Sequence, residues 1–296
     1  MQVEAHSTAR ERPSLFDQIP APGLVIVGIA TVQVGAALAT KLFDDLGPAG
    51  TVLLRVLFAA IVLCAISRPV PREHSRPDLR LAALFGLVLA FMNLSFYEAL
   101  DRIHLGIAVT LEFVGPLGVA LVGSRNRLDV LWALLAAAGV VLLGGFGTPD
   151  LTGVAFALIA GGFWAAYILI NARVGRAFEG GSGLAMAMAI GTIPLIPIGI
   201  VAAGSNLLHP GLLAAGFAVA LLSSVVPYSL EVEALRRIRP NVFGVLMSLE
   251  PGVAAIAGLV LIGQSLSPAD VVAIVLVVTA SAGATLGART PVPVDA

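Results

Sequence analysis

Residues 98–116 read EALDRIHLGIAVTLEFVGP, and residues 233–251, which lie 135 positions further along the chain, read EALRRIRPNVFGVLMSLEP. Without a gap, the two stretches share an opening Glu-Ala-Leu, an Arg-Ile pair, a leucine and a final proline. Agreement at charged and proline positions indicates an internal repeat, and chance similarity between two apolar stretches is the alternative. The pair therefore predicts a chain built from two similar halves.

The composition around these stretches is that of a membrane protein. Hydrophobic residues make up 58% of the 296 residues, charged residues 12%, and the mean hydropathy is +0.99. Soluble domains are about 45–50% apolar and about 25% charged. The net charge of −1 gives no indication of a nucleic-acid partner. Cys64 is the one cysteine, so no disulfide forms within the chain, and we expect it to be a small buried hydrophobe.

Ten segments are long and apolar enough to cross a bilayer, which takes about 17–25 residues. The connections between them are too short to hold a soluble domain. Arginines and prolines between Arg68 and Pro77 separate the second segment from the third. We predict an all-α polytopic membrane protein with ten transmembrane helices, at residues 23–40, 49–66, 81–98, 104–123, 129–146, 151–171, 183–203, 211–230, 241–262 and 268–287.

The repeat divides these ten helices into two sets of five. We predict a disordered tail at 1–20, a first repeat at 21–147, a second at 148–288 and a tail at 289–296. Five is an odd number, so the second copy enters the membrane from the opposite side. Inverted repeats of this kind recur in transporters, which bind substrate near the midplane between the repeats. The N-terminal tail has no clear cleavage site that would make it a signal peptide.

Basic residues predict the orientation, because short cytoplasmic loops carry an excess of Lys and Arg. With both termini in the cytoplasm, 14 of the 17 basic residues fall on cytoplasmic segments. Lys41 and Arg102 fall outside, and Arg55 falls within a span. The cytoplasmic set is Arg10, Arg12, Arg68, Arg72, Arg76, Arg80, Arg125, Arg127, Arg173, Arg176, Arg236, Arg237, Arg239 and Arg289. We therefore predict a multi-pass protein of a bacterial inner membrane, with both termini cytoplasmic.

Two ionisable residues lie at similar depth from the outer face. Arg55 lies roughly 9 Å inside the second span and Glu112 roughly 12 Å inside the fourth, at about 1.5 Å per residue. An ionisable side chain at such depth needs a partner or a watery cavity. We predict that Arg55 and Glu112 pair, either as part of a substrate pathway or as a purely structural ion pair.

Glu250 lies roughly 14 Å inside the ninth span, counted from the cytoplasmic side. No basic residue has a comparable depth on that side. A buried carboxyl without a cationic partner favours its protonated form, which is the property that a proton-coupling group requires. The alternative is a protonated or water-solvated structural glutamate.

Three prolines interrupt helical hydrogen bonding near these groups. A proline has no N–H, so Pro116 frees the carbonyl of Glu112 and Pro251 that of Met247. Pro227 frees the carbonyl of Ser223, next to Ser224 and Tyr228. Freed carbonyls at membrane depth are tolerated where they line protein or water. Each proline is predicted either to open a polar site or to make a kink for packing alone.

Other polar residues fall near mid-membrane, where they contact either a polar substrate or a neighbouring helix: Gln33, Asn93, Trp164 and Tyr167. Glu98, Glu231 and Glu233 lie near helix ends, where we favour an interfacial structural role, with Glu98 and Glu231 as alternative pathway entrances. Glycines expected to allow close helix packing are Gly35, Gly86, Gly115, Gly118, Gly139, Gly161, Gly162 and Gly258.

Enzyme signatures are absent from the sequence. It contains no H-E-x-x-H, G-x-S-x-G or Walker A pattern, and its four histidines form no metal-ligand spacing. We therefore predict no catalytic site, no cofactor and no metal. Without a nucleotide site, uphill transport must draw on an ion gradient.

Several segments resemble those of the bacterial threonine/homoserine exporters, in the EamA group of the drug/metabolite transporter superfamily. They are residues 106–117 (GIAVTLEFVGPL), 163–169 (FWAAYIL), 227–231 (PYSLE) and 243–251 (FGVLMSLEP). The resemblance covers about residues 20–288. It departs from the pattern at Gly263-Gln264, where relatives often carry Gly-Glu.

The resemblance implies ten helices in two inverted repeats and export of small amino acids by proton antiport, with Glu112 and Glu250 as the intramembrane acidic residues. The expected partners are a small polar substrate, protons and the lipid bilayer. Export or import of another metabolite or a cationic drug is an alternative, as is a non-transporting membrane scaffold. The oligomeric state stays open.

Overall fold

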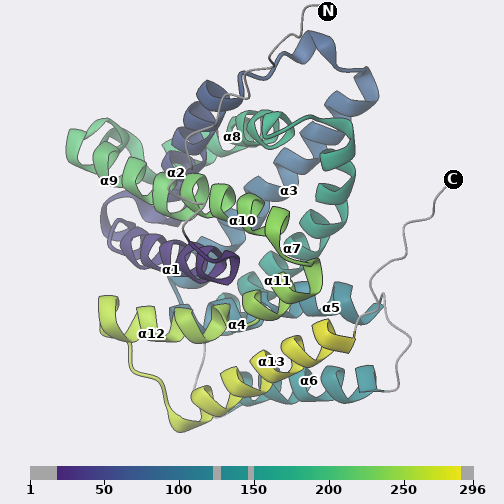
Figure 1. Cartoon of the computed structure of the whole chain (residues 1–296). Helices are drawn as coiled ribbons and strands as arrows, with labels where there is room; N and C mark the ends of the chain where they lie inside the picture. The colour runs from purple at the N-terminus through teal and green to yellow at the C-terminus, as the bar shows by residue number, and fades with distance from the viewer. Residues whose placement is uncertain (1–18, 123–127, 146–149, 288–296) are drawn as a thin grey trace, which may run out of the picture.

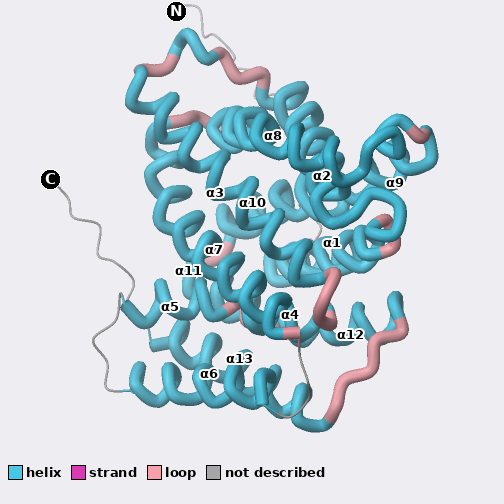
Figure 2. The backbone as a smooth tube through the Cα atoms, turned by 180° about the vertical axis from the view of Figure 1, so that it is seen from behind, coloured by secondary structure: helices cyan, strands magenta, loops and turns pink. Residues whose placement is uncertain are grey.

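The computed structural model describes residues 19–122, 128–145 and 150–287. Over these ranges every regular element is a helix (Figure 1, Figure 2). Most of both predicted tails lies outside the described residues, as do five of the basic residues used for the orientation: Arg10, Arg12, Arg125, Arg127 and Arg289.

Helices occupy each of the ten predicted segments. The first half holds α1 (Ala21–Thr40), α2 (Phe43–Ser67), the 3-10 helix η2 (Pro71–Glu73), α3 (Arg76–Leu100), α4 (Leu105–Glu112), α5 (Val114–Val122) and α6 (Leu128–Gly145). The second half holds α7 (Leu151–Ala177), α8 (Ser182–Ala203), the 3-10 helix η3 (Gly204–Leu208), α9 (Pro210–Ala220), the π-helix η4 (Leu221–Val225), α10 (Val226–Arg237), α11 (Pro240–Met247), α12 (Glu250–Ile262) and α13 (Pro268–Gly287).

The helical surface is apolar, as a bilayer requires. Eight described helical stretches are long and apolar enough to cross a membrane, and two apolar stretches, Leu105–Val119 and Val130–Leu142, are shorter. Large apolar side chains between 70 and 90% exposed include Val122, Val201 and Val260. In water such surface would drive aggregation, whereas lipid accepts it. The chain is therefore a polytopic all-helical membrane protein.

Two of the predicted spans are interrupted rather than continuous. The segment predicted at 104–123 breaks at Phe113, between α4 and α5, and that at 241–262 breaks at Ser248 and Leu249, between α11 and α12. The residues that directly follow α4 and α11 have nearly the same backbone angles, φ −64° and ψ −14° at Phe113 and φ −62° and ψ −13° at Ser248. Both breaks lie just before Pro116 or Pro251.

The helices pack in pairs drawn from opposite halves of the chain. The most extensive contacts join α2 with α8, α3 with α7, and α6 with α13. Helix α1 packs along α10 and η4, and α4 packs against α12. Figure 1 shows α12 and α4 side by side, with α13 and α6 running together below them. Helices from both halves of the chain therefore face each other inside the bundle.

Glycines allow several of these helices to touch backbone to backbone. A Cβ atom on Gly161 of α7 would lie 2.6 Å from the carbonyl oxygen of Glu112, and one on Gly115 would collide with the carbonyl of Gly161. The packing role predicted for Gly118 and Gly162 is wrong, because a Cβ atom on either meets no atom within 4 Å. Gly162 is exposed on α7, whereas its neighbour Gly161 is buried. The sequence did not show which of the two faces another helix.

Candidate functional site

A cavity of about 430 Å³ lies at the centre of the bundle. Its volume falls within the range of about 300–1,000 Å³ that is typical of small-molecule sites. All nine predicted substrate or proton pathway residues line it: Gln33, Arg55, Asn93, Glu112, Trp164, Tyr167, Ser223, Tyr228 and Glu250. Of the three predicted helix-breaking prolines, Pro116 and Pro227 line the cavity as well, and Pro251 is buried beside it.

Arg55 of α2 lines the cavity and contacts η4 in the second half of the chain. Its Nε donates to Ser224 Oγ at 3.2 Å, its Nη1 to Tyr97 Oη at 3.2 Å and its Nη2 to the Ser223 carbonyl at 2.9 Å. The guanidinium carbon also lies 5.4 Å from the centre of the Tyr97 ring. These contacts hold a buried cation in one orientation without a carboxylate.

The predicted ion pair between Arg55 and Glu112 is wrong. Among the described residues, neither side chain forms an ion pair. The reason is local backbone chemistry in the second half of the chain. Pro227 cannot donate to the carbonyl of Ser223, and that carbonyl accepts from Arg55 instead. Equal depth in the membrane therefore did not make the two residues partners.

The π-helix η4 supplies this carbonyl and a hydroxyl together. π-Helical turns inside α-helices are rare and frequently mark functional sites. In this one the neighbouring residues Ser223 and Ser224 are both buried, at 3% and 1% exposed. Helix α1 approaches the turn at Gly35, where a Cβ atom would collide with Ser223 Oγ. The close approach brings Gln33 of α1 into the same cavity.

The two intramembrane carboxyls have different surroundings. Glu250, the first residue of α12, accepts a hydrogen bond at Oε1 from Gln33 Nε2 at 3.1 Å. Its Oε2 is covered and has no partner within the described structure, and the same holds for Gln33 Oε1. Glu112, the last residue of α4, makes no hydrogen bond to another described residue, yet its oxygens are not among the covered, unpartnered atoms. Glu112 therefore opens to the cavity, whereas Glu250 is sealed at one oxygen.

Aromatic and amide side chains complete the lining. Trp164 meets Phe113 edge to face, with ring centres 5.2 Å apart, and Tyr167 stacks on Phe85 at 5.3 Å. Asn93 Nδ2 donates to the Leu89 carbonyl of its own helix at 2.7 Å. These ring contacts hold Trp164 and Tyr167 at the cavity wall.

Some lining residues were not predicted. Asn171, Ser281 and Thr285 also face the cavity. Ser281 and Thr285 are one helical turn apart in a mostly apolar span, and this spacing is visible in the sequence. The interfacial role favoured for Glu231 is incomplete, because Glu231 lines the central cavity and a second cavity of about 250 Å³.

The second cavity extends the first toward one end of the bundle. The two share Tyr167, Asn171, Tyr228, Glu231 and Leu235. The second cavity also reaches Phe178 and Gly183, where α7 ends and α8 begins. The polar path therefore continues from the centre toward the end of the molecule that carries the turn between α7 and α8.

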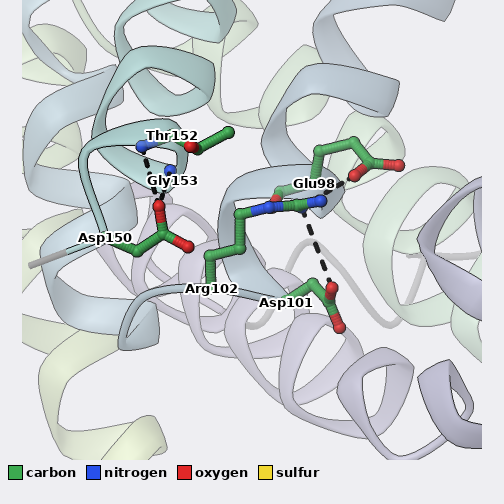
Figure 3. A network of polar contacts seen from close by, with 6 residues as sticks. All are labelled: Glu98, Asp101, Arg102, Asp150, Thr152 and Gly153. Carbon is green, nitrogen blue, oxygen red and sulfur yellow. Dashed lines mark hydrogen bonds and ion pairs between the residues drawn. The ribbon is translucent and has the colours of Figure 1, made fainter.

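A compact polar network lies where α3 ends and α7 begins (Figure 3). Arg102 pairs with Glu98 at 2.7 Å and with Asp101 at 3.8 Å, and its guanidinium lies 5.2 Å from the centre of the Phe156 ring. Asp150 accepts from the backbone N–H groups of Thr152 at 2.8 Å and Gly153 at 3.3 Å, which lowers the pKa of its carboxyl. Glu98 thus has a structural role and does not line the cavity.

Among the described residues, no group of three or more His, Cys, Asp or Glu side chains lies close enough together to hold a metal ion. The lone cysteine, Cys64, lies partly buried on α2, with Sγ 3.6 Å from the Ala185 carbonyl.

Comparisons with known proteins agree with this arrangement. Residues 151–286 match the model of the EamA-like transporter family. The threonine/homoserine exporters RhtA of Salmonella typhimurium and of Escherichia coli are each 41% identical to this chain over 271 residues, which cover 90% of it and 91% of each relative. A solved crystal structure has the same fold, with a TM-score of 0.58, 20% identity and coverage of 90% of this chain and 97% of that one. The chain therefore belongs to the EamA-like transporter family, in its threonine/homoserine exporter-like branch, and is a transporter rather than an enzyme.

Proposed function

We propose that this protein exports small polar amino acids of the threonine and homoserine type from the cytoplasm by antiport with protons. The observation that carries the proposal is a central cavity lined by a buried cation, Arg55, and two buried carboxyls, Glu112 and Glu250. A cavity with both charges suits a zwitterion better than a purely cationic drug. The names of the relatives, threonine/homoserine exporters, point to the same substrate class.

The proposal includes ten spans arranged as two inverted repeats, at 21–147 and 148–288, in a bacterial inner membrane with both termini cytoplasmic. The pairing of helices supports the repeat. Positions 135 apart put α4 over α11 and α5 over α12. The break between α4 and α5 and the break between α11 and α12 begin at residues with nearly the same backbone angles. With this orientation the second cavity, next to the turn between α7 and α8, opens toward the cytoplasm, which is the side from which an exporter loads.

Glu250 is the proposed proton carrier. Its Oε2 is covered by protein and has no partner among the described residues, so ionisation there has no cation to compensate it. A carboxyl in such a place holds a proton until the cavity changes its environment. Release of that proton as the repeats rock, or as a substrate ammonium group arrives, would couple export to proton entry.

Transport in proteoliposomes tests the function. With labelled threonine and an imposed pH gradient, we expect the wild-type protein to move threonine against its concentration. Glu250→Gln keeps the size of the side chain but cannot titrate, so it should still exchange threonine across a membrane without a gradient and lose pH-driven accumulation. Glu73→Gln, an exposed carboxyl in η2, is the matched control.

The outcomes separate the parts of the proposal. Absence of any threonine transport by the wild-type protein would refute the proposed substrate class. Accumulation by Glu250→Gln equal to that of the wild type would remove Glu250 from the coupling step and make Glu112 the carrier to test next.

A further inference from the structure

Arg55 is a buried cation whose carboxylate partner is missing from the described part of the protein. It is 8% exposed and lines the central cavity. A buried charge is costly unless it is paired and hydrogen-bonded. Its three hydrogen bonds go to neutral oxygens, those of Ser224, Tyr97 and the Ser223 carbonyl. The positive charge is therefore held in place without an ion pair to a described carboxylate.

The contacts leave Arg55 able to bind a carboxylate. A guanidinium has N–H donors beyond the three in use, and its planar donor geometry matches a carboxylate. Contacts from η4 and from Tyr97 of α3 fix the side chain, so little rotamer freedom is left to lose on binding. Arg55 is thus preorganised at the cavity wall.

Glu112 offers the complementary charge. It lines the same cavity, makes no hydrogen bond within the described structure, and its oxygens are not sealed as Glu250 Oε2 is. An ammonium group in the cavity would satisfy Glu112 in the way that a carboxylate would satisfy Arg55. The two residues that do not pair with each other are therefore each open to the opposite end of a zwitterion.

We propose that the cavity recognises the backbone of an α-amino acid at two points, with the carboxylate on Arg55 and the ammonium group on Glu112. This inference rests on the proposed function and deepens it, because it makes Arg55 and Glu112 specificity-determining residues and leaves Glu250 for the proton. The side chain of the substrate then lies among the aromatic lining, near Trp164 and Tyr167.

Analogues of threonine that lack one charge test each point separately. 1-Amino-2-propanol is threonine without its carboxylate, and 3-hydroxybutyrate is threonine without its ammonium group. Binding is measured by the thermal stabilisation of the purified protein at matched ligand concentrations, since a ligand of the folded state raises its melting temperature. Competition against exchange of labelled threonine in proteoliposomes gives the second measurement. Loss of one buried charge-assisted contact should weaken each analogue at least about tenfold relative to threonine.

Variants of Arg55 and Glu112 are tested against the same three ligands. Arg55→Gln should weaken threonine at least about tenfold and leave 1-amino-2-propanol unchanged, so that the two ligands bind alike. Glu112→Gln should weaken threonine by a similar factor and leave 3-hydroxybutyrate unchanged, so that these two ligands bind alike. Arg55→Lys keeps the charge but not the planar geometry and should recover part of the discrimination. Arg80→Gln, an exposed arginine on α3, is the control for loss of a positive charge.

The results show separately whether this inference fails and whether the proposed export function fails. If no α-amino acid stabilises the wild-type protein, the proposed function fails and the inference fails with it. If threonine binds and is transported, but 1-amino-2-propanol competes equally well, the inference alone is overturned. This comparison needs only the wild-type protein, so it decides the matter even if Arg55→Gln does not fold. A uniform loss of affinity for all three ligands in Arg55→Gln would also overturn it, because that is the result of a structural role.

Discussion

A proline on one helix determines where an arginine on another helix lies. Pro227 has no N–H, so the Ser223 carbonyl cannot bond within an α-helical turn, and Arg55 Nη2 donates to it at 2.9 Å. In lipid an unsatisfied carbonyl is costly, so this contact contributes to holding η4 and α2 together. The sequence contained both residues, but the depth argument that assigned Arg55 to Glu112 could not tell which neighbouring helix each side chain faces.

At Gly161 and Gly162 adjacent residues of one helix should respond oppositely to the same substitution. A Cβ atom at Gly161 would lie 2.6 Å from the Glu112 carbonyl oxygen, so Gly161→Ala must push α7 away from the break that carries Glu112. We expect a cost of about 1–3 kcal/mol, as for other overpacked sites, and reduced threonine transport. A Cβ atom at Gly162 meets nothing within 4 Å, so Gly162→Ala should be neutral or stabilise by up to about 1 kcal/mol.

Melting temperatures of both variants in the same detergent, together with threonine exchange rates, measure the contrast. Equal behaviour of the two variants would mean that the contact between α7 and Glu112 does not constrain the site.

At the scale of whole helices, the sequence predicted more than at the scale of contacts. Each segment predicted from apolar length holds helix in the described residues, because a bilayer demands long apolar runs whatever their partners. The breaks at Phe113 and at Ser248 and Leu249 were harder to locate, since none of these residues is a proline or glycine. They lie one turn before Pro116 and Pro251, where the helical bonds that the prolines cannot make are missing.

The start of α7 depends on one exposed carboxylate. Asp150 accepts from the N–H groups of Thr152 and Gly153, which lowers its pKa below its ordinary value. Stabilisation by such a group is present above the unfolded-state pKa and is lost as the pH falls through the lower folded-state pKa. Asp150→Ala should therefore reduce the melting temperature at neutral pH, and its difference from the wild type should vanish in acid.

The conservative variant separates the cap from the charge. Asp150→Asn retains a capping oxygen but does not titrate, so it should stay near the wild type at neutral pH and show a weaker dependence on acid. Melting temperatures between neutral pH and the acid limit of the detergent sample measure all three proteins. A wild-type melting temperature in Asp150→Ala at neutral pH would show that the cap does not contribute to stability.

At the scale of the whole molecule, the two ends of the central cavity differ. Helix α4 packs against α12, whereas the corresponding pair in the proposed repeat, α11 and α5, has no comparable contact over its described residues. We call the end where α4 meets α12 the tight end. Small residues close it, since a Cβ atom on Gly106 would lie within 3.1 Å of three atoms of Ala255. The opposite end, where α5 and α11 lie, adjoins the second cavity. In the proposed transport cycle, this asymmetry corresponds to a state that is open on one side only.

Gln264 forms two hydrogen bonds at the tight end. Its Oε1 accepts from the backbone N–H of Leu105 at 2.9 Å, which caps α4, and its own N–H donates to the Gly258 carbonyl at 3.0 Å. The family resemblance leads to the expectation of a glutamate at this position, and a carboxylate oxygen can accept the same bond. The sequence alone gave no reason to assign this loop residue a role, because its partner is 159 positions away.

Breaking this bond should shift the protein toward the state open on the opposite side. A net hydrogen bond is worth about 0.5–1.5 kcal/mol, or about two- to tenfold in a population ratio. In a Cys64→Ser background, Met92→Cys places a single thiol on the cavity wall, where a membrane-impermeant maleimide added outside intact cells reports outward opening. Gln264→Leu should raise the labelling rate by that factor, because α4 loses its cap. Gln264→Glu should keep the wild-type rate, as should Ser265→Ala, an exposed neighbour in the same loop. Unchanged labelling in Gln264→Leu would mean that the small-residue contact between Gly106 and Ala255 closes this end without Gln264.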